Sequence, residues 1–387
     1  MKNILLKKVL FTAMASLLAG SAYSAEEINT DERTTIIEHD PSVFQPDPLH
    51  EHSEYDVDEQ LIIYGDKKAN ENPRPLLELG RHIYDTGTFS EPSYALGKKN
   101  PINHQFIIYG DWRTAIAYND NGVAETGQIA TRLNLDIDWK FTGTERLHAL
   151  ITPLERDGRY TRYILGGDQE RGWEPEIEGE LDALFFEGDL GAITSGLTDE
   201  YTKWDLPFAV GLMPLFYQNG IWLDDAFTGL AFTIPAQNSA ALEISNMDIT
   251  FFAGFDRVST VFRDNSGLAP DEDDVYLYGL TSFIEANDGY WEMGYGFTDG
   301  RKRFDDQDYH NVSVAFTRRY GGWLSNSLRI ISNFGQDRDN NQQQTADGQL
   351  VLLENSFITS KPSTLVPYLN VFAGFDCPQS LARADAA

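Results

Sequence analysis

Apolar and polar residues alternate without interruption along residues 132–141, which read RLNLDIDWKF. Because successive side chains of a β-strand point to opposite faces, this alternation predicts a strand with one apolar and one charged face. The apolar face comprises Leu133, Leu135, Ile137, Trp139 and Phe141. A soluble sandwich would bury this face in protein, whereas a membrane barrel would present it to lipid and direct the charges into a lumen.

From residue 105 onward, strand-like runs follow one another and many are joined by short turns. Short connections separate 128–141 from 146–153 (TGTE), 240–245 from 249–255 (NMD), 275–285 from 290–298 (ANDG) and 311–319 from 327–334 (YGGWLSN). Longer polar segments occupy 155–180, 256–274, 299–309 and 335–349. Short turns alternating with long loops are typical of outer-membrane barrels, and a sandwich gives no reason for them. We therefore predict an all-β fold, a transmembrane antiparallel up-and-down β-barrel with about 14–16 visible strands.

Small residues occupy the polar faces of several predicted strands, as Gly294, Gly296, Ser313 and Ala315 illustrate. Small side chains leave space in the middle of a barrel, so this pattern predicts an open lumen. Aromatic residues gather beside the short turns, which is typical of the girdle at a membrane interface. These residues are Trp139, Phe141, Tyr290, Trp291, Tyr320 and Trp323.

Two stretches are apolar on both faces, PFAVGLMPLFYQNG at 207–220 and TLVPYLNVFAGF at 364–375. In a barrel, such strands require that an inward-folded loop or the N-terminal arm cover one face. A soluble two-layer fold would also contain strands of this kind, because both of their faces are buried.

The chain begins like an exported protein. Lys2, Lys7 and Lys8 accompany the apolar run VLFTAMASLLAG, and the small residues SAYSA follow. This order predicts a signal peptide over residues 1–24, cleaved after Ser24. We assign residues 25–104 to an extended acidic arm that holds a first strand or an inward-folded segment. Residues 105–387 are assigned to the barrel.

Composition narrows the range of partners. The formal net charge is −30, which argues against nucleic acid because phosphate binding needs a basic surface. Cys377 is the one cysteine, so an intramolecular disulfide does not stabilise this exported chain. The expected partners are the outer-membrane lipid bilayer and small solutes or ions, and a homo-oligomer is compatible with the pattern.

Sequence motifs that would indicate catalysis, such as GxSxG, HExxH and a Walker loop, are absent. His39, His50 and His52 lie near several acids, and we interpret them as part of a solvated arm rather than a metal site. Residues 337–341 begin like a calcium loop but lack the required glycine and glutamate. We therefore expect no catalytic residue, no metal and no cofactor.

The charged residues of the strand faces are the best functional candidates, because rings of such groups set the field inside a pore. The pore-lining candidates are Asp111, Arg113, Arg132, Asp136, Asp138, Lys140, Arg146 and His148. The alternative is that these residues form mutually neutralising pairs across strands. Arg156, Arg159 and Arg162 could likewise bind an anionic solute or balance the acidic run EPEIEGE in the same loop.

The signal peptide, the hairpin ATRLNLDIDWKFTGTERLHALI and the stretch GLMPLFYQNGIWLDDAF resemble Gram-negative outer-membrane porins, notably alginate-export-like and carbohydrate-porin-like channels. The likeness covers about residues 105–375 and is one of pattern. It implies a channel in the cell outer membrane for passive or weakly selective diffusion of small hydrophilic solutes. Barrels of this kind usually end in a strand with a terminal aromatic residue. The ending CPQSLARADAA therefore predicts that closing strands are missing.

A porin-type channel without enzymatic activity is accordingly the expected function. One alternative is a secreted soluble all-β carbohydrate-active enzyme or binding protein, which as a glycosidase would need two carboxylates in a cleft. Another alternative is an outer-membrane barrel with an enzymatic or adhesive role. A requirement for detergent would separate the membrane proteins from the soluble one.

Overall fold

The computed structural model describes residues 76, 77, 79 and 91–384, except 157, 265, 339–342 and 360–363. The chain forms two units, residues 1–87 and 88–387, and all elements below belong to the second. The expected signal peptide, most of the expected arm and His39, His50 and His52 lie outside the described residues. Among the described helices, none is long and apolar enough to cross a membrane.

Seventeen strands form one sheet. In chain order they are β1 (Gln105–Asp120), β2 (Glu125–Lys140), β3 (Arg146–Ile151), β4 (Glu155–Arg156), β5 (Arg159–Gly167), β6 (Gly172–Glu174), β7 (Leu181–Asp189), β8 (Pro207–Tyr217), β9 (Leu223–Ser239), β10 (Ile244–Asp256), β11 (Val275–Ala286), β12 (Gly289–Gly300), β13 (Tyr309–Tyr320), β14 (Leu324–Phe334), β15 (Asp347–Phe357), β16 (Tyr368–Cys377) and β17 (Ala382–Arg383). β4, β6 and β17 have only two or three residues, so the fourteen longer strands agree with the expected number.

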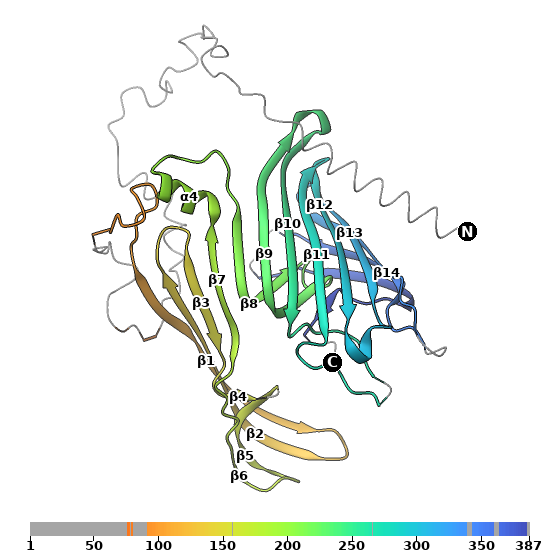
Figure 1. Cartoon of the computed structure of the whole chain (residues 1–387). Coiled ribbons are helices and arrows are strands. Elements are labelled where there is room, and N and C mark those ends of the chain that lie inside the picture. Colours follow the sequence, from red (N-terminus) through yellow and green to blue (C-terminus); the bar gives the residue numbers. More distant parts are fainter. Residues whose placement is uncertain are drawn as a thin grey trace, which may run out of the picture. The chain divides into compact units, whose positions relative to one another are not determined.

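Apart from the two-residue β17, which pairs in parallel with β9, the strands pair antiparallel and largely in chain order, which confirms the predicted all-β, up-and-down fold. β2 pairs with β1 on one side and with β3 and β5 on the other, and β3 pairs with β7. From β7 to β16 each strand pairs with the next, and β9–β14 are seen side by side in Figure 1. Among the described strands, β1 pairs only with β2 and β16 only with β15, so the sheet is open there.

The turn chemistry was predicted correctly at ANDG and wrongly at NMD. Asn287 and Asp288 join β11 to β12 with φ of 59° and 56°, as a tight hairpin with two left-handed residues requires. The chain instead leaves β9 through the 3-10 turn η2 (Ala240–Leu242), followed by Glu243 with φ of 55°. Residues 246–248 lie inside β10, where a register shift accommodates them. The left-handed residue, not the turn-like composition, therefore marks the reversal.

A helix, α4 (Leu190–Thr198), lies in the connection between β7 and β8 and was not predicted from the strand pattern. Asp189 caps its first turn by accepting a hydrogen bond from Ala192 N at 2.6 Å. Its other carboxylate oxygen accepts from Leu206 N, just before β8, at 2.9 Å. Asp199 ends the helix in a left-handed conformation with φ of 58°. The connection is consequently much longer than the other turns at this end of the sheet.

Strand register arranges side chains in rows that cross the sheet, and neighbouring rows point to opposite faces. One row contains Asp138, His148, Phe185, Gly211 and Gly229. The next row contains Ile137, Ala149, Leu184, Leu212 and Thr228. We call the side of the first row the polar face and the side of the second row the apolar face.

The hydrophobic core lies on the polar face of β8–β15. The segments 218–222, 257–263 and 378–384 fold against this face and supply buried side chains, including Trp222 and Leu381. Trp222 donates a hydrogen bond through Nε1 to Asn311 Oδ1 at 2.8 Å. Leu381 N donates to Trp222 O at 2.7 Å, so the segments hold each other as well as the sheet.

The small residues of these strands fit the covering segments and do not leave an empty lumen. A Cβ atom at Gly294 would lie 2.6 Å from the Trp222 ring, and one at Gly296 would lie 2.3 Å from Leu381. The expectation of an open lumen is therefore wrong for β8–β15, because glycine and serine there admit large side chains from elsewhere in the chain. The stretch 207–220 has the inward cover that its two apolar faces predicted, since Met213 is buried in this core.

Candidate functional site on the polar face

All eight pore-lining candidates lie on the polar face of β1, β2 and β3. The register places Arg113 opposite Arg132, Asp138 opposite His148, and Lys140 opposite Arg146. Asp111 stands opposite Asn134, whose Nδ2 donates to its carboxylate at 3.1 Å. The structure thus brings these residues together in one charged surface, while their role in a pore stays a prediction.

Arg146 and His148 converge on a carboxylate that the sequence did not single out, Glu187 of β7. Glu187 Oε1 lies 3.1 Å from Arg146 Nε and 3.1 Å from His148 Nε2. Arg146 also pairs with Asp138 at 3.6 Å, and the His148 ring stacks on Phe185 at 5.0 Å. Alternation within the run LDALFFEGD places Glu187 on the same face as Phe185, but only the register shows that this face meets β3.

The other arginines of this surface also have carboxylate partners. Arg132 Nε lies 2.9 Å from Glu155 Oε2, Arg113 Nε lies 2.5 Å from Asp111 Oδ2, and Arg162 Nη2 lies 2.6 Å from Glu174 Oε2. Six carboxylates and five cationic side chains therefore occupy the surface, which leaves it close to neutral. They are Asp111, Asp136, Asp138, Glu155, Glu174 and Glu187, with Arg113, Arg132, Lys140, Arg146 and Arg162.

Cross-strand neutralisation, the alternative left open by the sequence, accounts for most of these charges. Asp136 and Lys140 are different, because neither forms an ion pair with a residue that the structure describes. Arg162 pairs with Glu174 at the start of the acidic run, and Arg156 donates to Ile177 O within it. The ion pair of Arg162 favours balance of the acidic loop over anion binding, and Arg156 holds the same loop through a backbone carbonyl.

The lipid-facing candidates Leu133, Leu135, Ile137 and Trp139 lie on the apolar face of β2, directly behind the charged surface. Phe141 follows the end of the strand. Its ring lies 4.7 Å from Trp139 and 6.3 Å from Phe186, so these aromatic side chains cluster at the short-turn end. Contact of these residues with lipid stays a prediction.

A second charged cluster centres on Arg329 of β14, which is fully buried on the polar face. Its Nη1 donates to Gln218 Oε1 at 2.6 Å, and its Nη2 lies 3.4 Å from Glu292 and 3.7 Å from Glu354. Gln218 belongs to the inward turn 218–222, so Arg329 connects this turn to three strands. This cluster could not be predicted from the sequence, because its members lie far apart in the chain.

A third group of charges lies in the connections beyond β10 and β12. Lys302 Nζ lies 2.9 Å from both Asp273 and Asp274, and these hydrogen bonds raise the pKa of Lys302. The hydrogen bond from Lys302 likewise lowers the pKa of Asp274. Burial raises the pKa of Asp308 to about 6, although Gly300 N donates to it at 2.7 Å. Asp308 therefore carries an unfavourable charge near neutral pH.

We expect Asp308→Asn to raise the melting temperature at pH 8 and to have little effect near pH 4. A carboxyl group whose pKa is higher in the folded than in the unfolded state binds protons more tightly when folded, so it destabilises the protein as pH rises through both values. The amide keeps an oxygen that accepts from Gly300 N and removes the charge. Melting curves of both proteins from pH 4 to pH 8 measure the effect, and a stabilisation that is independent of pH would contradict it.

Comparisons with known proteins found structural likeness only. No family model and no curated protein matches the chain. One similar solved structure is OmpTdeltaL8, a loop L8 deletion mutant of the Vibrio cholerae outer membrane protein OmpT. It has 14% identity, a TM-score of 0.31, and coverage of 70% of this chain and 93% of that one. Another is Salmonella typhi OmpF in complex with daunomycin, with 8% identity, a TM-score of 0.31, and coverage of 73% and 100%. Neither likeness identifies the family of the chain.

Proposed function

We propose that this chain is an outer-membrane channel of the porin type, which lets small hydrophilic solutes diffuse with weak selectivity. The supporting observation is an inverted burial pattern in β9–β14. Polar-face residues such as Asn311, Ser313 and Arg329 have 0% exposure. On the apolar face, Leu328 and Ile330 are 44% and 45% exposed.

Inverted burial of this kind is expected where the outside of a protein is lipid. The accessible apolar side chains extend over many strands, among them Leu184, Val210, Leu230, Tyr278, Leu328, Ile330, Leu369 and Val371. A soluble monomer rarely exposes a contiguous apolar patch of more than a few hundred Å². The soluble enzyme or binding protein is thus the weaker alternative, because it would need another layer over this face.

The route for solutes in this proposal follows the charged surface of β1, β2, β3 and β7. Most of the polar face of β8–β15 is filled by its own chain, whereas no part of the chain that the structure describes puts a comparable apolar cover on the charged surface. Carboxylates and cations in nearly equal number give little net field. Weak ion selectivity follows from this balance, because selectivity in a pore depends on an excess of one sign of charge.

We expect the protein to require detergent for extraction, to migrate differently on gels before and after heating, and to give single-channel steps in planar bilayers. Expression in a Gram-negative host followed by membrane fractionation and conductance recording tests each point. Purification as a soluble monomer without detergent would rule out the proposal. A detergent-extracted protein without conductance would favour the barrel with an enzymatic or adhesive role.

A further inference from the structure

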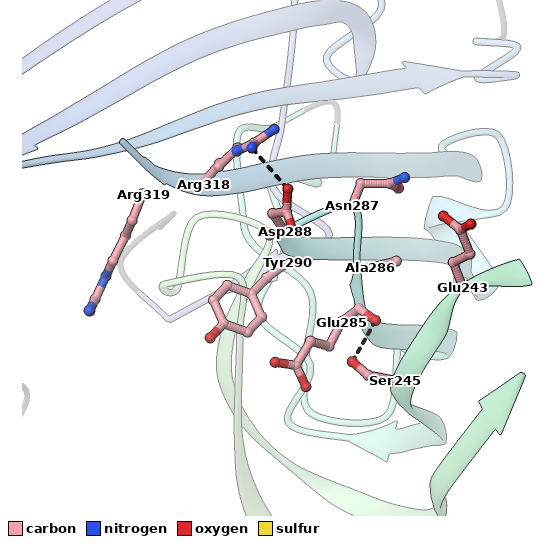
Figure 2. A pocket seen from close by; sticks show the side chains of 10 residues that line it. Glu243, Ser245, Glu285, Ala286, Asn287, Asp288, Tyr290, Arg318 and Arg319 are labelled. Carbon is pink, nitrogen blue, oxygen red and sulfur yellow. Dashed lines mark hydrogen bonds and ion pairs between the residues drawn. The ribbon is translucent and has the colours of Figure 1, made fainter. Parts of the chain in front are cut away.

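A cavity of about 760 Å³ lies at the short-turn end of β11, β12 and β13, and both Arg318 and Arg319 line it (Figure 2). Its lining includes Glu285, Tyr290 and Arg319. Tyr290 was expected in an aromatic girdle on the lipid side. The register instead places it on the polar face, directly opposite Glu285 on one side and Thr317 on the other.

Tyr290 lines the cavity and forms an aromatic platform with its neighbour Phe283 on the polar face. The rings of Tyr290 and Phe283 stack at 5.3 Å with an interplanar angle of 25°, and their side chains are 42% and 40% exposed. Stacked rings that remain accessible inside a polar surface offer their faces to a ligand, because ring faces attract apolar groups and cations. In Figure 2 the Tyr290 ring is seen between Arg319 and Glu285.

Charges of opposite sign flank the platform and are not engaged with each other. Glu285 and Arg319 form no side-chain hydrogen bond or ion pair with a residue that the structure describes. The neighbouring Arg318 differs, because its Nη2 donates to Asp288 Oδ2 at 3.0 Å. Arg319 is two residues beyond Thr317, so its side chain belongs to the polar face, whereas that of Arg318 belongs to the opposite face.

The distance between the two free charges limits the ligand. They lie on β11 and β13, with β12 between them, and Arg319 is two residues further along its strand than Thr317, which is level with Glu285. Two strand spacings of about 4.8 Å and this offset put their backbones about 12 Å apart. A simple anion would be attracted by Arg319 but repelled by the carboxylates. A simple cation would be attracted by Glu285 but repelled by Arg319. A neutral sugar would leave both charges without partners. A zwitterion of similar span satisfies both, and an extended tripeptide, about 10 Å long, comes within reach of the two long side chains.

We propose that this cavity binds short zwitterionic peptides. The terminal ammonium pairs with Glu285, the terminal carboxylate accepts two hydrogen bonds from the Arg319 guanidinium, and the middle of the peptide lies on the Tyr290–Phe283 platform. This inference rests on the proposed function, because it names a class of solute for the proposed channel. Binding itself does not depend on conduction and is measured without it.

Calorimetric titration of the detergent-purified full chain with trialanine, N-acetyl-trialanine, trialanine amide and the neutral sugar maltotriose tests the proposal. We expect saturable binding of trialanine and a loss of about two- to fivefold when either terminal charge is blocked, as for one charge pair at a partly exposed site. Glu285→Gln should bind trialanine and its N-acetyl form equally. Arg319→Gln should do the same for trialanine and its amide.

Arg318→Gln is the matched control, because Arg318 also lines the cavity but is already paired with Asp288, so it offers no free charge to a ligand. We expect it to bind trialanine within twofold of the wild type. Absence of trialanine binding, equal losses in Arg318→Gln and Arg319→Gln, or maltotriose binding as tight as trialanine binding would each overturn the peptide assignment. If the protein binds trialanine but does not conduct, the proposed channel is wrong and the peptide site stands. If the protein conducts but does not bind trialanine, the peptide site is wrong and the channel stands.

Discussion

Ile137→Arg is expected to prevent assembly of the protein into the outer membrane, whereas Asp136→Arg is expected to leave assembly intact. The two residues are neighbours in β2 but occupy opposite faces of the sheet. Ile137 stands between Ile108 of β1 and Ala149 of β3 on the apolar face. If this face contacts lipid, an arginine near mid-bilayer costs about 2–4 kcal/mol, which is a large part of the stability of one domain.

Asp136 is the better control on the polar face because it has no ion pair to lose. Its neighbours across the strands are Tyr109 and Leu150. Asp138→Arg would be less informative, since Asp138 pairs with Arg146 and the variant would place two cations together. The fraction of heat-modifiable protein in outer-membrane preparations measures assembly. Equal tolerance of both substitutions would contradict lipid contact at Ile137.

A further effect of Asp136→Arg is expected in conductance, provided that the protein forms the proposed channel. The substitution replaces a free negative charge by a positive one on the charged surface, so the preference for cations over anions should fall. Reversal potentials in a salt gradient measure this preference. An unchanged reversal potential would place the conduction route elsewhere.

Arg329→Ala is expected to destabilise the protein by about 3–5 kcal/mol, the usual cost of removing one partner from a buried ion pair. The variant would leave Glu292 and Glu354 without their cation, and Gln218 Oε1 would keep only the hydrogen bond from Ser313 Oγ. Because Gln218 belongs to the inward turn, the loss should also release the segment that carries Trp222. Unfolding in urea, followed by tryptophan fluorescence, measures the free energy.

Arg318→Ala is the matched control, since its pair with Asp288 is 39% and 84% exposed. An exposed pair contributes about 0–1 kcal/mol, so the two arginines should differ severalfold in effect. Replacing Arg329, Glu292 and Glu354 together by apolar residues should recover part of the stability, because no charge is then left unpaired. A similar small loss in Arg318→Ala and Arg329→Ala would contradict the role of the buried cluster.

The period-two pattern was sufficient to predict the strands, because the faces of a strand are encoded by neighbouring residues. Alternation in RLNLDIDWKF assigned Asp138 and Ile137 to opposite faces, and the ANDG turn fixed the hairpin of β11 and β12. Local conformation also explains the wrong prediction of a turn at NMD and the failure to predict α4. NMD has turn-like composition, but Glu243 adopts the left-handed conformation at which the chain reverses. α4 is short and its cap, Asp189, lies among strand-like residues.

The candidate site was predictable only as a set of residues on one face. Charges on β1, β2 and β3 could be assigned to a common side from their alternation. Their partners could not, because Glu187 meets Arg146 through the pairing of β3 with β7, and Arg329 meets Gln218 across more than a hundred residues. Such contacts depend on register and on the paths of connections, which leave no local pattern in the sequence.

By itself the sequence determined that this protein is an antiparallel up-and-down sheet with an apolar and a charged face, because those features depend on the alternation of adjacent side chains. The tertiary structure alone decided what covers each face. It placed the Trp222 ring over Gly294 of β12 and its Nε1 against Asn311 of β13. On the other face it left Leu328 and Ile330 accessible. Small residues admit either water or a large side chain, and only the folded chain brings such a side chain to them.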